Sequence, residues 1–451
     1  MINQLRYFIV LLWLSLTANA GEFVEYNQTK LALIHATLLD GQGGEIKENQ
    51  TILIKGGKFQ SVGNDNHTAI PDGYKVIDVK NKTVIPGIVG VHNHLQTPGQ
   101  DFKGKTLAKL YLASGVTTIQ TVGAAFPEQE LALAQSIESR QDIGPEIVPS
   151  GPYFDGPKGH QSMVNATDDD NISDIIENWM ERGVKWFKVY RHITPKQLRT
   201  IITEVHQRGG FVTGHLCSVT YRQAVDMGID GVQHGFNSVS DFRKDKEPGQ
   251  CNGSRGYIDR LDLGNDAVSS LIELMVSNKT FMTSTLAIYE SSISHRAVAD
   301  RQSLTVMSDV MKRRYEAMRE NAKGEKDVQR EKRLSRIMEF EYLFYKQGGL
   351  LGAGVDAGRF VLPGFGDQRN YELLLEAGFS TSEAVQVMTS NGAKILKRDD
   401  IGSIKKGARA DFVILDGDLR KSRSIRDVLY VFKQGVGYNA SKLLQSLHGQ
   451  F

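Results

Sequence analysis

The stretch PGIVGVHNHL, residues 86–95, ends an apolar run with two histidines that stand two positions apart. In an extended strand, side chains two positions apart point to the same face and lie roughly 6.6 Å apart along the chain. His92 and His94 can therefore reach one common space, and imidazole nitrogens are good zinc ligands. Taken alone, the pair also fits two ordinary polar residues at a strand end, so the rest of the chain must decide.

Residues 86–399 alternate short apolar runs with segments of helix length, such as 172–183 and 195–209. This alternation is typical of a parallel sheet with crossover helices. Eight such runs predict a closed (β/α)8 barrel, or TIM barrel, of the α/β class. The expected strands are IVGVHNH (88–94), GVTTIQT (115–121), EIVPSGP (146–152), VKWFKVY (184–190), FVTGHL (211–216), GVQHGF (231–236), FMTSTLAI (281–288) and LLGAGVDA (350–357).

Ionisable residues stand at the carboxyl ends of five of these runs, where a (β/α)8 barrel gathers its functional groups. One histidine at one strand end carries little weight, but four histidines with a lysine and an aspartate are hard to explain as core or surface residues. The combination predicts a metal centre. Its members are His92 and His94 on the first run, Lys188 on the fourth, His215 on the fifth, His234 on the sixth and Asp356 on the eighth.

Lys188 is the unusual member, because it lies in the apolar run VKWFKVY. A lysine there can extend its ammonium out of a buried strand. Beside two metal ions, however, the ammonium would be desolvated and repelled, and its pKa would fall. A neutral amine can add carbon dioxide and become a carbamate, an anion whose two oxygens can bridge two cations.

The two ends of the chain differ from the middle. Residues 29–85, and later 401–436, contain short segments rich in β-branched residues that end in Gly, Asn or Asp. We expect residues 21–85 and 400–451 to form one small composite β-sandwich domain beside a catalytic barrel at 86–399. The charged stretch 289–345 is expected to form helices with solvated faces.

Residues 1–20 have the pattern of an export signal peptide. Arg6 gives a positive start, residues 8–16 form an apolar run too short to span a membrane, and Ala18-Asn19-Ala20 is a small-x-small cleavage pattern. We therefore expect an exported mature chain, periplasmic or secreted, that starts at Gly21 and has no stable membrane anchor.

The formal net charge is +2, and no long basic run is interleaved with aromatic residues, so nucleic acid is a poor candidate for a partner. A small-molecule substrate is expected instead, and a homo-oligomer stays open. The chain has two cysteines, Cys217 and Cys251. In an exported protein they can form one disulfide, and two buried thiols are the alternative.

In their order, these segments resemble the amidohydrolase superfamily over nearly all of the mature chain. PGIVGVHNH is similar to the family's His-x-His strand, FKVY to its fourth-strand lysine segment, and GVDAG to its eighth strand. The imidazolonepropionase-like and Xaa-Pro or Xaa-Arg dipeptidase-like members look most similar. One departure is Gly90, where the family often has an aspartate two positions before the first histidine.

The resemblance implies two divalent metal ions, with zinc expected, bridged by a hydroxide and by a CO2-derived carbamate on Lys188. That hydroxide would attack an amide carbonyl while Asp356 accepts the water proton and returns it to the leaving nitrogen. Tyr190 could donate to the substrate carbonyl and the loop residue His160 could contact substrate, although both also fit structural roles. The implied ligands are His92, His94 and Asp356 for one metal, and His215 and His234 for the other.

We therefore expect an exported metal-dependent hydrolase that cleaves C–N bonds of small amides, such as dipeptides or N-acyl amino acids. A cyclic-amide or lactone hydrolase on the same site and a non-catalytic metal-binding barrel are the alternatives. Base deamination is disfavoured, because the segment His215-Leu216-Cys217-Ser218 lacks the glutamate of such relatives. The arginines that could clamp a substrate carboxylate are Arg191, Arg222 and Arg359, which follow strands four, five and eight.

Overall fold

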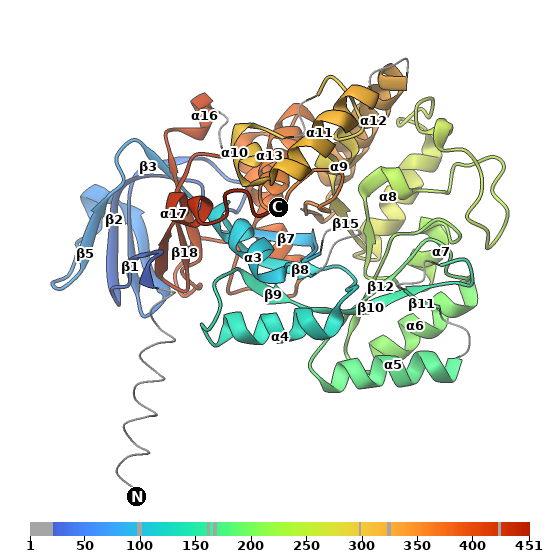
Figure 1. The fold of residues 1–451 in the computed structure, drawn as a ribbon, viewed down its shortest axis with the longest axis horizontal. Coiled ribbons are helices and arrows are strands. Elements are labelled where there is room, and N and C mark those ends of the chain that lie inside the picture. Colours follow the sequence, from blue (N-terminus) through green and yellow to red (C-terminus); the bar gives the residue numbers. More distant parts are fainter. Residues whose placement is uncertain are drawn as a thin grey trace, which may run out of the picture.

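The computed structural model of the protein describes residues 21–96, 102–159, 163–165, 169–296, 299–322, 326–422 and 425–451. The predicted signal peptide, residues 1–20, and the predicted loop residue His160 lie outside these ranges. The described chain has an α/β fold, in which a β-rich part lies beside a larger part of parallel strands and helices (Figure 1). The predicted α/β class is thereby confirmed.

The β-rich part is one sheet of nine strands drawn from both ends of the chain. Figure 1 shows the blue N-terminal strands next to the red C-terminal ones. Inside it, the rings of Phe412 and Phe432 stack with their centroids 4.2 Å apart. The expected domain boundaries stay predictions. The strand order is β1 (Val24–Tyr26), β19 (Val436–Asn439), β18 (Val428–Lys433), β17 (Phe412–Asp416), β6 (Lys82–Pro86), β2 (Lys30–Leu38), β3 (Lys47–Lys55) and β4 (Lys58–Asn64), with β5 (Lys75–Asp78) paired to β2.

The other strands form two parallel sheets, and each of the eight predicted runs contains a strand. The sheets meet where a bridge joins Ala124 to Pro152, and where the amide of Asp356 donates to the carbonyl of His92 at 2.9 Å. A closed barrel goes beyond these contacts and stays a prediction. The first sheet has β7 (Ile88–Asn93), β8 (Val116–Thr121) and β9 (Glu146–Val148); the second has β11 (Val164–Asn165), β10 (Ser150–Asp155), β12 (Trp186–Val189), β13 (Phe211–Gly214), β14 (Gly231–Gln233), β15 (Phe281–Ser284) and β16 (Leu351–Ala353).

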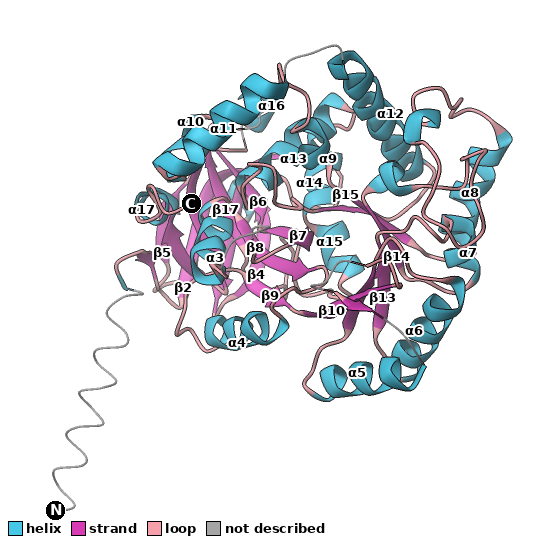
Figure 2. Cartoon of the chain, turned by 45° about the vertical axis from the view of Figure 1, so that its right-hand side comes forward, coloured by secondary structure: helices cyan, strands magenta, loops and turns pink. Residues whose placement is uncertain are grey.

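Helices surround the parallel strands (Figure 2). Their starts follow local chemistry: Thr194 forms a capping box with Gln197, and Pro195 occupies the first turn of its helix. Among the described residues, every helix is too short or too polar to cross a membrane. The helices are α3 (Gly104–Ala113), α4 (Pro127–Glu138), α5 (Asp169–Glu181), α6 (Pro195–Gln207), α7 (Tyr221–Asp226), α8 (Asp266–Ser277), α9 (Leu286–Glu290), α10 (Arg301–Val306), α11 (Asp309–Ala322), α12 (Lys326–Lys346), α13 (Phe365–Glu376), α14 (Thr381–Met388), α15 (Ser390–Ile395), α16 (Leu419–Ser422) and α17 (Ala440–Gln445).

Helix α12 corrects the prediction of solvated helix faces over 289–345. Its C-terminal half is packed into the core, where Phe340 stacks on Phe236 with ring centroids 4.3 Å apart. The neighbouring Glu341 is fully buried, and Ser284 Oγ donates to its Oε2 at 2.5 Å. The many charges of this helix hid its apolar stripe, because the exposed positions dominate the local composition.

Glu341 makes stability depend on pH. Burial raises the pKa of its carboxyl from 4.5 to about 8, so the folded state keeps this proton to higher pH than the unfolded chain. Stability from the neutral carboxyl is complete below pH 4.5 and is lost as pH rises through about 8. We expect the difference in melting temperature between Glu341→Gln and the parent, measured by thermal unfolding, to depend on pH. At pH 9 this difference should favour the variant by a few degrees more than at pH 5. Glu339→Gln, on the exposed face of α12, is the control, and parallel parent and Glu341→Gln curves would contradict the prediction.

Candidate metal centre

Three predicted ligands converge where the first and last parallel strands end. The Nε2 atoms of His92 and His94 lie 3.5 and 3.3 Å from Asp356 Oδ1. One ligand atom from each residue lies within 4.8 Å of the other two. Ligands about 2.1 Å from a tetrahedral zinc ion stand about 3.4 Å apart, so this spacing is close to what one ion requires.

The remaining predicted ligands surround the same carboxylate. His234 Nδ1 lies 3.5 Å from Asp356 Oδ2, and the rings of His215 and His234 are 4.1 Å apart at their centroids. Lys188 Nζ lies 3.4 Å from His92 Nε2. Side chains from five strand ends therefore meet in one place, as the sequence predicted.

Burial lowers the pKa values of the histidines and of Lys188 at this centre. Burial and the nearby charge of Lys188 lower the pKa of His92 to about 4, and burial lowers the pKa of His94 and His234 as well. Burial also lowers the pKa of Lys188 to about 8. For Asp356 burial acts in the opposite sense, yet the facing imidazoles of His92 and His234 hold its pKa well below the usual range. Neutral imidazoles and an anionic carboxylate are the forms that bind a metal ion.

Two of the predicted ligands have left-handed backbone, a conformation that residues other than glycine rarely adopt. His234 has φ 70° and Asp356 has φ 46°. Around His234, the Tyr221 hydroxyl lies 3.2 and 2.8 Å from the carbonyls of Gln233 and Gly235. Contacts of this kind hold strained backbone at functional sites, where the strain sets the direction of a side chain.

A second layer of polar groups orients the two histidines of β7. His92 Nδ1 lies 2.5 Å from Gln233 Oε1, and the Gln233 amide donates to Thr213 Oγ1 at 2.6 Å. The amide thereby fixes the proton on Nδ1 and leaves Nε2 to face the site. His94 is held through its backbone by the Tyr111 hydroxyl, which donates to its carbonyl at 3.1 Å. Sequence reasoning missed Gln233, although it directly precedes His234.

Asn93 fills the space that Gly90 leaves. A Cβ at Gly90 would lie 2.2 Å from Asn93 Oδ1, so no larger residue fits there unless Asn93 moves. The Asn93 amide donates to Asp367 Oδ1 on α13 at 3.2 Å. Burial raises the pKa of Asp367 to about 7. The buried pair of Asn93 and Asp367 therefore connects the His-x-His segment to α13 beside Gly90.

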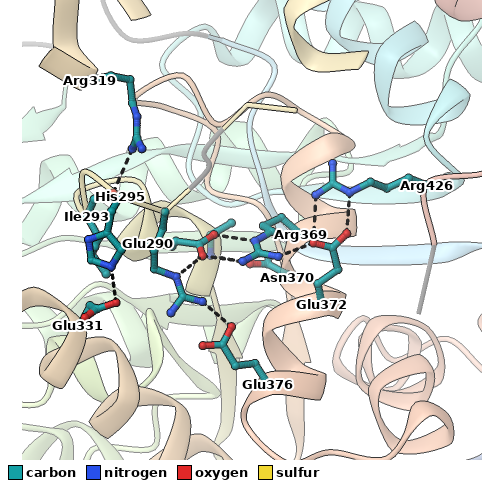
Figure 3. Close-up of polar contacts among 12 residues, drawn as sticks. Glu290, Ile293, His295, Arg319, Glu331, Arg369, Asn370, Glu372, Glu376 and Arg426 are labelled. Carbon is teal, nitrogen blue, oxygen red and sulfur yellow. Dashed lines mark hydrogen bonds and ion pairs between the residues drawn. The ribbon is translucent and has the colours of Figure 1, made fainter. Parts of the chain in front are cut away.

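Helix α13 also holds the segments after β15 and β16 together, and its Arg369 lies against Glu290 of α9 (Figure 3). Asn370 donates to the carbonyl of Gly354 at 2.7 Å and accepts from the amide of Ala287 at 2.8 Å. The next residue back, Arg369, pairs with the buried Glu290 of α9 at 2.7 Å. These bonds fix the chain two residues before Asp356.

The other predicted site residues lie around this group. The Tyr190 ring packs against His215 with centroids 4.7 Å apart. Arg191 is partly buried at the end of β12, whereas Arg222 and Arg359 are exposed. Tyr153, which the sequence did not reveal, places its hydroxyl 3.4 Å from His94 Nδ1. Cys217 and Cys251 form a disulfide, which decides between the two alternatives above.

Comparisons with known sequences agree with this geometry. Residues 355–437, which begin one residue before Asp356, match the model of the amidohydrolase family. The dihydroorotase of Thermoanaerobacter sp. (strain X514) is 28% identical over 176 residues, covering 36% of this chain and 39% of that protein. The dihydroorotase of Elusimicrobium minutum (strain Pei191) is 38% identical over 92 residues, or 19% and 21% of the two chains. These matches span about 39% or less of the relatives' own length.

Solved structures match over almost the whole chain. A putative prolidase from Bifidobacterium longum aligns with 94% of this chain and 99% of its own at a TM-score of 0.67 and 24% identity. A bottromycin amidohydrolase aligns with 93% and 91% at a TM-score of 0.70 and 16% identity. Residues 355–437 thus match the amidohydrolase family, and the fold of the chain is similar to that of solved amidohydrolase structures. The predicted resemblance is confirmed.

A substitution of Gln233 tests whether the polar groups behind the predicted ligands orient the ring of His92. Replacing it with leucine leaves His92 Nδ1 without its acceptor, so the ring can turn or change tautomer. We expect Gln233→Leu to weaken zinc affinity by about 10- to 100-fold, measured by competition with a chromogenic chelator. Gln120→Leu is the matched control, because Gln120 is buried and its amide makes no hydrogen bond among the described residues. Equal affinities for the two variants would contradict the assigned role of Gln233.

Proposed function

We propose that the protein is a metal-dependent hydrolase that cleaves C–N bonds of small amides, such as dipeptides or N-acyl amino acids. The convergence of His92, His94 and Asp356 beside Lys188 carries this proposal. Their donor atoms are nitrogen and carboxylate oxygen, which suit zinc and similar divalent ions. The buried imidazoles are neutral at physiological pH, so the residues present fit such ions.

The residues would hold two ions in two groups. His92, His94 and Asp356 would hold one, His215 and His234 the other, and Lys188, as a carbamate, would join them. Bound divalent ions would lower the pKa of water and polarise the substrate carbonyl.

The chain's own residues would move the proton and place the substrate. Asp356 is a carboxylate with oxygens directed at His94 and His234, so it can accept a water proton and return it to the leaving nitrogen. In the balanced reaction the C–N bond breaks, the new C–O bond forms and the amine leaves protonated. Tyr190, packed on His215, would donate its hydroxyl to the substrate carbonyl.

The proposal also includes a closed barrel and export of the protein. The contacts between β7 and the end of β16, and between Ala124 and Pro152, support one closed barrel. Export through a cleaved leader at residues 1–20 is supported by its sequence pattern. A cyclic amide or lactone would use the same residues, and only a substrate comparison separates it from the leading choice.

Loss of Asp356 tests the reaction. We expect purified, zinc-loaded protein to hydrolyse members of a panel of dipeptides, N-acyl amino acids and cyclic amides, and to lose activity with a chelator. Asp356→Asn should lower kcat by about 100-fold or more, since the amide cannot accept the proton. Asp309→Asn, at an exposed position on α11, is the control. An Asp356→Asn enzyme as active as the parent would refute the assigned role.

The carbamate has its own test. We expect 13C-labelled bicarbonate to add one carbamate carbon signal to the zinc-loaded protein in 13C NMR, and Lys188→Met to remove it. Lys433→Met is the matched control, because burial also lowers the pKa of Lys433 to about 8 while its ammonium bonds to the carbonyl of Gly144. A signal that survives in Lys188→Met but disappears in Lys433→Met would place the modification elsewhere.

A further inference from the structure

Two arginines contact the disulfide beside the candidate metal centre. Arg191 Nη2 lies 3.6 Å from Cys251 Sγ, and Arg243 Nη1 lies 3.5 Å from Cys217 Sγ. Since the two sulfurs are bonded to one another, both guanidinium groups border the same small region. Arg191 was a candidate from the sequence, whereas nothing in its local sequence singled out Arg243.

This region adjoins the metal ligands. Arg191 directly follows Tyr190, and Cys217 stands two residues after His215. Tyr190 and His215 pack against one another at the ends of β12 and β13. The disulfide ties the loop after β14, which carries Arg243, to the end of β13. A substrate whose amide lies at the metal centre can therefore extend toward these arginines.

Several buried polar atoms of these arginines and of the loop after β14 make no hydrogen bond among the described residues. Arg243 is 7% exposed, and its Nη1 donates to the carbonyl of Asn252 at 2.6 Å. The buried Nε atoms of Arg191 and Arg243 make no hydrogen bond among the described residues. The same holds for the buried hydroxyls of Ser238 and Ser240 on the loop after β14.

Two partly buried arginines elsewhere in the described chain each form ion pairs with two carboxylates. Arg369 binds Glu290 and Glu372, and Arg409 binds Glu146 and Asp411. No such ion pair with a described carboxylate forms at Arg191 or Arg243. Burying the Arg243 guanidinium without a paired carboxylate is costly. The guanidinium of Arg191, which is partly buried and interacts electrostatically with Asp155, lies beside the same disulfide and repels that of Arg243.

A carboxylate supplied by the substrate would remove both costs. The planar guanidinium forms two parallel hydrogen bonds to a carboxylate. We propose that Arg191 and Arg243 bind the free carboxylate of the amino acid that leaves as the amine. This inference rests on the proposed function, and it narrows the substrates to dipeptides and N-acyl amino acids with a free terminal carboxylate.

Paired substrates test the inference. The best dipeptide from the panel is compared with the same dipeptide carrying a terminal carboxamide. We expect the parent to prefer the free acid by at least about tenfold in kcat/KM, which corresponds to about 1.4 kcal/mol. Arg243→Gln and Arg191→Gln should raise KM for the free acid about tenfold or more and leave the carboxamide unchanged. Arg199→Gln, at an exposed position on α6, should behave as the parent.

A binding measurement separates this inference from the hydrolase proposal. Calorimetry on metal-free protein compares N-acetyl-L-alanine with N-acetyl-L-alaninamide. If no panel member is hydrolysed, but the parent binds the acid better than the amide and Arg243→Gln loses that preference, the carboxylate site stands and the hydrolase proposal fails. If hydrolysis occurs while free acids and carboxamides react equally in the parent, the carboxylate site is refuted. If Arg243→Gln does not fold, Arg191→Gln is used in its place. A preference of Arg191→Gln for the free acid over the carboxamide that equals the parent's would overturn the inference.

Discussion

The contact between Asp356 and the first strand is the constraint on which the rest of the structure depends. The amide of Asp356 donates to the carbonyl of His92, while its carboxylate faces the imidazoles of His92, His94 and His234. This joins residues more than 260 positions apart in sequence and fixes where the first and last parallel strands meet. A carboxylate in this position is tolerated because polar hydrogens of imidazole, or a cation, can balance its charge.

The support for this contact comes from outside the ligand set. Gln233 holds the ring of His92, Asp367 holds Asn93 between the two histidines, and Asn370 fixes the chain before Asp356. Two of these residues are on α13, so one helix braces both ends of the strand arrangement. Such outer groups commonly matter for metal affinity nearly as much as the ligands, because they limit the directions a ligand can take.

The sequence predicted the elements that depend on local patterns. Each of the eight predicted apolar runs contains a parallel strand, whereas the short β11 lies in none of them. The rule that functional groups stand at the carboxyl ends of strands selected His215 and His234. The sequence did not predict features that depend on contacts with residues distant in the chain. Glu341 reads as one more charge in a charged helix, and the seventh run looked like a longer strand because LAI is apolar in a helix as well as in a strand. Gln233 and Arg243 acquire meaning only from the residues they face.

The disulfide connects the carboxylate inference with the export proposal. Disulfides persist in oxidising compartments and are rare in the reducing cytosol. Arg243 lies on a loop that Cys217 and Cys251 join to the strand carrying His215, so reduction would release the loop that positions one guanidinium. Recognition of a substrate carboxylate would then depend on the compartment, although the ligands on the strand ends would stay in place. A periplasmic or secreted hydrolase with this construction would keep its full specificity only where the bond stays oxidised.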